Sequence, residues 1–229
     1  MSEPISMPRW LLNLVQVLCE TGQADDLRKR IDNGGGAVPL RLFHLWQADV
    51  VLPMLGEALP EHRQSLLALQ SLHQRAALGV IGRQGEWRAT LKPVLLALYR
   101  KAYPYDAAHA KAHASALTYG LAPANTAMIA EHFGDAEAFA EYYAQLNTEA
   151  AATAFAQAHA SANAEVSARA FADGDAETCA QVCGATVRVY VGACAQAEEQ
   201  RHALSNQLAA GLERSLATLQ SRSTGERHE

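Results

Sequence analysis

The uneven placement of alanine and leucine along the chain is the feature that most constrains its fold. Of 46 alanines, 32 fall between Ala107 and Ala197, whereas 20 of the 28 leucines fall in the first hundred residues. Alanine is the best helix former because it loses no side-chain entropy on ordering, and it is depleted in strands. We therefore expect an all-α protein with a Leu-packed front and an Ala-packed back, in which small side chains let helix axes approach closely.

Size, charge and cysteine content narrow the class of protein. The 229 residues can bury a substantial core, and 24 acidic against 19 basic residues argue against general nucleic-acid binding. Four cysteines match neither a disulfide framework nor a zinc signature. The start MSEPISMPRW has no signal-peptide pattern, and no apolar run approaches the ~20 residues of a membrane helix. We therefore expect a cytoplasmic protein that needs neither membrane nor nucleic acid.

Apolar residues at helical spacing predict the helices of the front region. The expected helices cover 8–18, 24–31, 40–53, 60–82 and 86–102. A glycine run at 33–36 ends the second, and Pro53 disturbs the third. The apolar stripe of the fourth runs to Val80 and ends at Gly82.

The back region is expected to be helical almost throughout, with a few clear breaks. A break at 103–106 leaves Asp106 to cap a helix over 107–120, and a second helix covers 123–133. The chain restarts at Gly134-Asp135, and Asn147 or Thr148 is expected to cap a longer helix that runs through Ala172. A break at 173–175 precedes a continuous helical stretch from 176 to 220.

These segments give about nine or ten helices in a multi-helix bundle or an irregular helical-hairpin solenoid. We expect a Leu-rich region at 1–103, an Ala-rich region at 104–221 packed with it as one domain, and a flexible tail at 222–229. Residues 108–116 also echo residues 154–162, at an offset of 46 that suits stacked helix pairs. Alanine-rich sequences often resemble one another by chance, so chance similarity explains this echo more simply than a repeat does.

Two histidines of the Ala-rich region are the candidate metal ligands. His109 and His113 are four residues apart, so a helix places both on one face ~6 Å apart. A catalytic metal needs further ligands, and Glu199 and His202 supply a single ExxH motif where a di-iron centre needs two. A polar or partly buried helix face accounts for the two histidines more simply, and we expect no cofactor.

A better candidate is a surface for a protein partner around one expected helix junction. Carboxylates and tyrosines gather there, namely Glu131, Asp135, Glu137, Glu141, Tyr142 and Tyr143. Tyrosine anchors interfaces because it buries a large area at low entropic cost, and acidic groups around it would steer a basic partner. The alternative is an ordinary exposed helix whose tyrosines turn inward. No serine or cysteine motif for nucleophilic catalysis accompanies these residues.

One stretch of the chain resembles a known group of proteins. It contains LWQADVVLP at 45–53, Pro60, Gly82, the segment GEWR at 85–88 and AAHAKAHASALTYG at 107–120. Together these are similar to the Ala-rich, all-helical immunity proteins of bacterial polymorphic-toxin systems, over about residues 42–120. The resemblance implies a protein that binds and blocks a cognate toxin without catalysis, and it assigns no functional residues.

Three functions therefore stay open. The leading one is a non-catalytic binding protein, most simply an immunity protein that neutralises a basic toxin domain. The second is a metal- or ligand-dependent helical enzyme that uses His109 and His113. The third, suggested by the internal echo alone, is a helical-repeat scaffold or adaptor.

Overall fold

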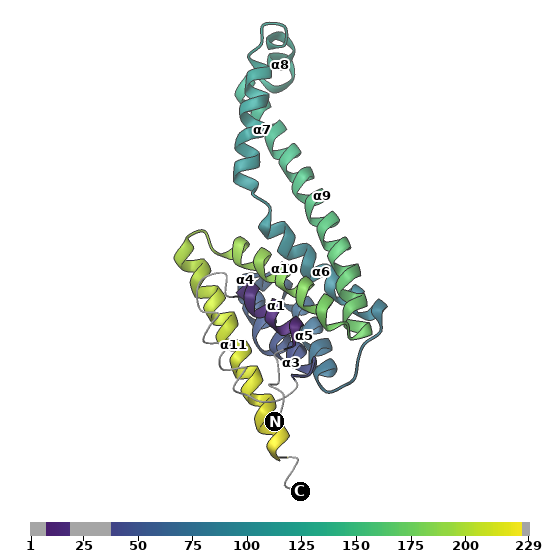
Figure 1. The fold of residues 1–229 in the computed structure, drawn as a ribbon. Coiled ribbons are helices and arrows are strands. Elements are labelled where there is room, and N and C mark those ends of the chain that lie inside the picture. The colour runs from purple at the N-terminus through teal and green to yellow at the C-terminus, as the bar shows by residue number, and fades with distance from the viewer. Residues whose placement is uncertain (1–7, 19–37, 226–229) are drawn as a thin grey trace.

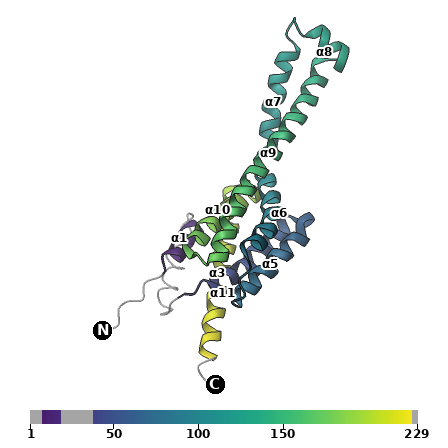
Figure 2. The same ribbon diagram turned by 90° about the vertical axis from the view of Figure 1, so that its right-hand side faces the viewer.

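A packed helical body and a projecting helical arm make up the molecule (Figures 1 and 2). The computed structural model describes residues 8–18 and 38–225, with side chains described up to residue 219. Within these ranges every regular element is a helix, which confirms the all-α prediction. The expected helix at 24–31 and the glycine run after it lie outside the described residues.

The body contains most of the helices. In chain order they are α1 (Arg9–Leu18), α3 (Arg41–Trp46), the π-helical turn η1 (Gln47–Val51), α4 (Leu52–Ala58), the 3-10 turn η2 (Pro60–His62), α5 (Arg63–Ala77), α6 (Gln84–Ala102), α10 (Ala176–Cys194) and α11 (Glu198–Gly225). The arm consists of α7 (Tyr105–Gly120), α8 (Thr126–Phe133) and the first half of α9 (Ala136–Asp173). The second half of α9 returns into the body, so front and back regions share one core.

Large aromatic and aliphatic side chains fill the body. Trp46, Trp87 and Phe43 are completely buried among leucines of α1, α3, α5 and α6. The Nε1 group of Trp46 donates a hydrogen bond of 3.0 Å to the carbonyl of Leu208, which ties α3 to α11. At Gly211 a Cβ would lie 2.4 Å from Cγ1 of Val50, so glycine is what permits α11 to lie this close. The C-terminal helix is thus an integral part of the core.

Pro53 changes the form of its helix but does not end it. Because proline has no N–H, it cannot donate to a carbonyl of the preceding turn. The helix widens into a π-helical turn just before it, and then continues as α4 to Ala58. The carbonyl of Ala48 instead accepts a hydrogen bond of 2.7 Å from Nε2 of Gln70 on α5. The predicted disturbance of the helix by Pro53 is confirmed, but a side chain of α5 provides a hydrogen bond to a carbonyl of the disturbed turn.

The following helix, α5, is shorter than expected. It ends at Ala77, and Gly79 reverses the chain with a φ of +86°. Val80, which we expected within the buried stripe, lies beyond the helix and is 60% exposed. Glycine adopts positive φ without steric cost, so the earlier Gly79, and not Gly82, sets the boundary.

A stripe of small residues with a spacing of four forms the spine of α9. Its members are Ala140, Ala144, Thr148, Ala152, Ala156, Ala160, Ala164 and Ala168, all of them at most 2% exposed. Four residues turn an α-helix through 400°, so this stripe winds about 40° further with each step. It therefore follows a right-handed path around α9. Helices α7 and α6 lie against successive parts of this path.

The break between α6 and α7 fits this winding. A single straight helix cannot follow a path that turns so steeply, whereas two shorter helices joined at Tyr103-Pro104 can. Pro104 itself precedes the first residue of α7, and Asp106 lies within the first turn without a capping hydrogen bond. The expected cap at Asp106 is therefore wrong, since α7 already begins at Tyr105, the residue before Asp106.

Two further boundaries differ from the sequence prediction. Helix α9 is continuous over its 38 residues, so neither Asn147 nor Thr148 starts a new helix; Thr148 instead takes one of the buried positions of the stripe. The stretch expected to be continuous from 176 to 220 is interrupted at 195–197 and folds back as two helices. The predicted breaks at 134–135 and 173–175 are confirmed, and there Asp135 and Asp175 cap the following helices, since each accepts from a backbone N–H three residues on.

Candidate functional site

The six residues expected to meet a partner all lie near the outer end of the arm. Glu131 belongs to α8, Asp135 caps α9, and the other four lie on the first two turns of α9, namely Glu137, Glu141, Tyr142 and Tyr143. All six are exposed, with Tyr142 at 57% and Tyr143 at 43%. The tyrosines therefore do not turn into a core.

An aromatic cluster connects the three helices of the arm. Phe139 lies at its centre, with ring centroids 5.1 Å from Phe133, 6.0 Å from Tyr119 and 6.0 Å from Tyr143. Phe133 also contacts Tyr142, at 5.7 Å. These separations are those of favourable aromatic pairs. The rings pack on one another and yet present large areas to solvent.

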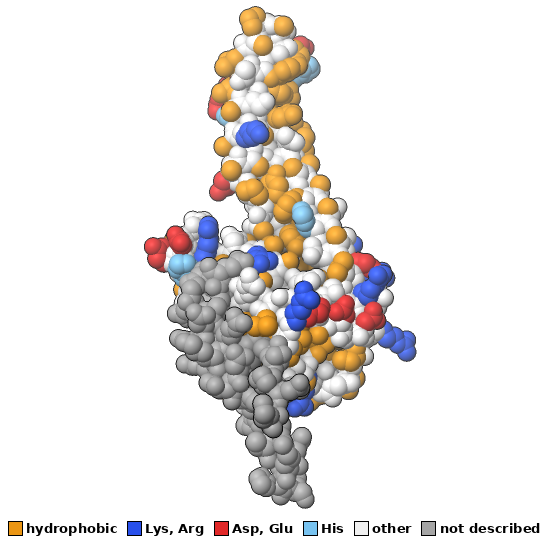
Figure 3. Space-filling view, viewed as in Figure 1, with side chains coloured by type: hydrophobic (Ala, Val, Ile, Leu, Met, Phe, Trp, Pro, Cys, Tyr) orange, Lys and Arg blue, Asp and Glu red, His pale blue; other side chains and the backbone are white. Residues whose placement is uncertain are grey.

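An open groove of about 450 Å³ runs beside this cluster. Six residues line it, namely Ser115, Ala116, Tyr119, Met128, Phe139 and Tyr143. More apolar side chains stand exposed nearby on the arm, including Leu121 at 61% and Leu146 at 59%. Figure 3 shows hydrophobic side chains spread along the arm, with acidic and histidine side chains at its edges in this view. Exposed apolar side chains that gather beside a groove often mark a binding site.

The opposite side of the α7–α9 seam is polar. His109 and His113 share one face of α7, as their spacing predicts, and both rings turn toward glutamates of α9. Nε2 of His113 lies 3.2 Å from Oε1 of Glu137, and Nε2 of His109 lies 3.5 Å from Oε1 of Glu141. Among the residues that the structure describes, no group of three or more histidine, cysteine or acidic side chains is arranged to hold a metal ion. The geometry thus joins each histidine to a carboxylate across the seam.

Charge is concentrated in the arm. Residues 105–147 contain five carboxylates, of Asp106, Glu131, Asp135, Glu137 and Glu141, against the single amine of Lys111, which gives a formal charge of −4 with neutral histidines. The whole chain has a formal charge of −5, so the remaining residues are nearly balanced. A negative surface on a projecting element attracts positively charged partners and raises their rate of encounter.

A second polar cluster lies deep in the body. Nδ1 of His44 and Nδ1 of His73 are 3.0 Å apart, and the rings of Trp87 and Phe171 enclose them. Burial lowers the pKa of His44 to about 4, and burial together with the nearby His44 lowers the pKa of His73 as well. Both imidazoles are therefore neutral at pH 7, and one donates its Nδ1–H to the other.

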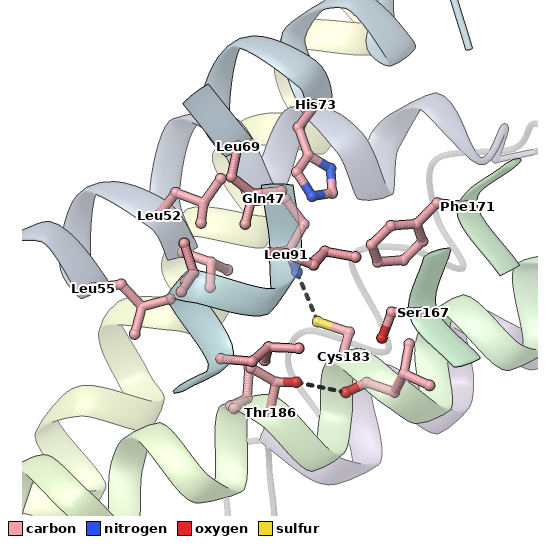
Figure 4. A pocket seen from close by; sticks show the side chains of 15 residues that line it. Gln47, Leu52, Leu55, Leu69, His73, Leu91, Ser167, Phe171, Cys183 and Thr186 are labelled. Atoms are coloured by element: carbon pink, nitrogen blue, oxygen red, sulfur yellow. Dashed lines mark hydrogen bonds between the residues drawn. The ribbon is translucent and has the colours of Figure 1, made fainter. Parts of the chain in front are cut away.

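A small cavity of about 40 Å³ adjoins His73 (Figure 4). Its polar lining includes Gln47, whose Nε2 lies 2.7 Å from Sγ of Cys183, together with Ser167 and Thr186. Burial raises the pKa of Cys183, and burial raises that of Cys179 to about 12. These thiols remain protonated at neutral pH, so they pack in the core and are not activated nucleophiles.

A second open groove, of about 340 Å³, lies at the base of the arm between α6 and α9. Its lining includes Arg100 and Lys101 together with apolar residues such as Leu59 and Leu96. Arg100 is already held by Glu149 and by Thr153 Oγ1, to which its Nη1 donates at 2.6 Å. The arginine that would attract an anion thus has internal partners.

The sequence prediction missed most of the residues that line the groove of the arm. It found the carboxylates and Tyr142 and Tyr143, because these are close together in the chain. It missed Tyr119, Met128 and Phe139, which line the groove from three different helices. The sequence does contain a signal for them. These large side chains stand among alanines, which are too small to cover them, and this pattern predicts that they are exposed.

None of the helices in the described ranges 8–18 and 38–225 combines the length and apolarity that crossing a membrane requires. Searches of family models, curated proteins and solved structures found no match to this chain.

Proposed function

We propose that this chain is a non-catalytic binding protein that uses its arm to contact a basic protein partner. The observation that carries the proposal is the gathering of exposed aromatic and acidic side chains near the outer end of the arm. Interfaces combine aromatic anchors that become buried with polar groups at the rim, and the arm offers both. Its shape leaves the contact residues accessible from several sides.

We further propose that the partner is a bacterial toxin domain, which makes the protein an immunity protein. The support for this step is the resemblance of residues 42–120 to Ala-rich helical immunity proteins. Toxin domains that act on nucleic acids or other anionic substrates have basic active sites, and an acidic arm complements such a surface. An inhibitor of this type needs tight binding and no chemistry of its own.

The test is a titration of the full-length protein with the product of the gene that adjoins its own. We expect a stable complex, and we expect cells that express both proteins to grow while cells that express the partner alone do not. The double variant Glu131→Lys, Tyr142→Ala removes one exposed carboxylate and one exposed ring from the outer end of the arm. It should weaken binding by about tenfold or more.

A matched control is Glu57→Lys, which reverses an exposed charge on α4 in the body. This variant should bind as tightly as the wild type. Equal binding by the arm variant and the wild type would show that the arm is not the contact. Failure of the wild type to bind the adjoining gene product, or to protect cells from it, would refute the immunity function.

A further inference from the structure

We infer that the groove lined by Tyr119, Met128, Phe139 and Tyr143 binds an amphipathic α-helix of the partner, with apolar residues inward and Lys or Arg at its edges. This inference rests on the proposed function and names the part of the arm and the kind of segment that meet. The groove has about 450 Å³ of space and lies between α7, α8 and α9. Sites of this volume bury several side chains of a ligand.

The lining favours a helix over an extended segment. A buried peptide must pair its backbone N–H and C=O groups, and an extended segment does so by joining a sheet edge. The described part of the chain contains no strand, and the backbone groups of α7 and α9 bond within their own helices. The side-chain groups of the lining that can hydrogen-bond to a peptide backbone are the hydroxyls of Ser115, Tyr119 and Tyr143. These are too few to pair the backbone of an extended segment. A helix satisfies its own backbone and presents one apolar face, as this groove requires.

The neighbouring charges favour a basic occupant. Glu131 lies one helical turn from Met128 on α8, and Asp135 lies one turn before Phe139 at the start of α9. Two further carboxylates of the arm, Glu137 and Glu141, lie against histidines on the opposite flank of the seam. Glu131 is exposed and forms no ion pair with any described residue, so its carboxylate is available to a partner.

The same charges argue against a second copy of this chain as the occupant. Two arms placed together would bring two formal charges of −4 side by side. Like charges opposed across an interface cost several kcal/mol, whereas a basic helix gains the corresponding attraction. A heterologous partner is therefore the favoured occupant.

The experiment uses the full-length protein and a synthetic peptide of about 18 residues, with leucines on one helical face and lysines on the other. A twin peptide carries glutamate in place of each lysine. The variant Ser115→Trp fills the groove from an exposed position, and Ala114→Trp adds the same side chain at an exposed position that does not line the groove. Both variants should keep the melting temperature of the wild type.

We expect the leucine–lysine peptide to bind the wild type and the Ala114→Trp variant equally, and to bind the Ser115→Trp variant about tenfold more weakly. The leucine–glutamate twin should not bind. Equal binding by the two tryptophan variants would overturn the groove as the site, and equal binding of both peptides would overturn the basic occupant. A dimer of the wild type that Ser115→Trp dissociates would show a second copy to be the occupant.

The adjoining gene product, titrated against the same two tryptophan variants, separates the two proposals. If it binds both variants as tightly as the wild type, the groove inference fails and the proposed function stands. If it binds none of them while the peptide results hold, the proposed function fails and the groove remains a site for basic helices.

Discussion

The body of this protein buries its large apolar side chains, whereas the arm leaves most of its own exposed or half-buried. The body buries tryptophans, phenylalanines and leucines in one core, whereas between residues 105 and 147 the fully buried apolar side chains are one isoleucine, Ile129, and three alanines. Burying a leucine contributes about 1.5–3 kcal/mol, and burying the methyl of an alanine contributes much less. The arm therefore depends on helix propensity and close packing, and it leaves its aromatic surface for a partner.

The largest effect should come from the core of the body. Trp46→Ala removes a fully buried ring and its hydrogen bond to Leu208, so we expect a loss of about 3–5 kcal/mol in the free energy of unfolding, measured with urea. In the arm, Phe139→Ala removes a ring that is already partly solvated and should cost much less. Equal losses from the two variants would contradict the contrast between body and arm.

Acid should destabilise the body next most strongly. In the unfolded chain an imidazole gains its proton near pH 6.5, whereas burial holds the pKa of His44 near 4 and lowers that of His73 too. The unfolded state therefore binds more protons between these values, so stability is complete above pH 6.5 and falls as the pH drops toward 4. His44 alone accounts for about 3 kcal/mol over this range.

Urea unfolding at pH 7 and at pH 4.5 measures this loss. The double variant His44→Phe, His73→Leu removes both titrating groups, and its stability should change far less between the two pH values. A wild type that is equally stable at both would contradict the neutral, buried pair.

The alanine stripe should tolerate no enlargement. Ala152→Leu inserts a larger side chain at a position that is 1% exposed, so we expect a loss of about 1–3 kcal/mol. The neighbouring Ala151→Leu changes an exposed position and should have little effect. Hydrogen exchange should rise in α7 and the outer half of α9, while the amides of α3 and α5 change less. Uniform exchange changes throughout the chain would show that arm and body unfold as one unit.

Sequence reasoning predicted the helical class and most element types because alanine propensity and apolar spacing are local signals. It identified the helix over 107–120, and the breaks at 134–135 and 173–175, from short motifs. It also brought together the carboxylates and tyrosines of the arm, since their exposure follows from an alanine-rich background.

It failed where a distant neighbour decides the outcome. The helix survives Pro53 because Gln70 from α5 satisfies a free carbonyl, and α9 passes through Thr148, whose side chain is buried although it could have capped a new helix. The groove was not predictable because Tyr119, Met128 and Phe139 come from three helices whose packing no local pattern specifies. The alanines with a spacing of four were visible in the sequence. That they form a buried stripe depends on the path of α6 and α7 along α9, which the sequence does not specify.

Thr148 offers the finest test of the arm. It is the one polar member of the stripe, it is 2% exposed, and its Oγ1 has no hydrogen-bond partner. An unpaired buried hydroxyl costs free energy, and threonine has a lower helix propensity than alanine. Thr148→Ala should therefore stabilise the protein by about 1 kcal/mol and slow hydrogen exchange in the arm, whereas Thr148→Val keeps the shape, removes the hydroxyl and should give a smaller gain. A loss of stability in Thr148→Ala would mean that the threonine methyl fills space that alanine cannot, and that the arm relies on side-chain packing after all.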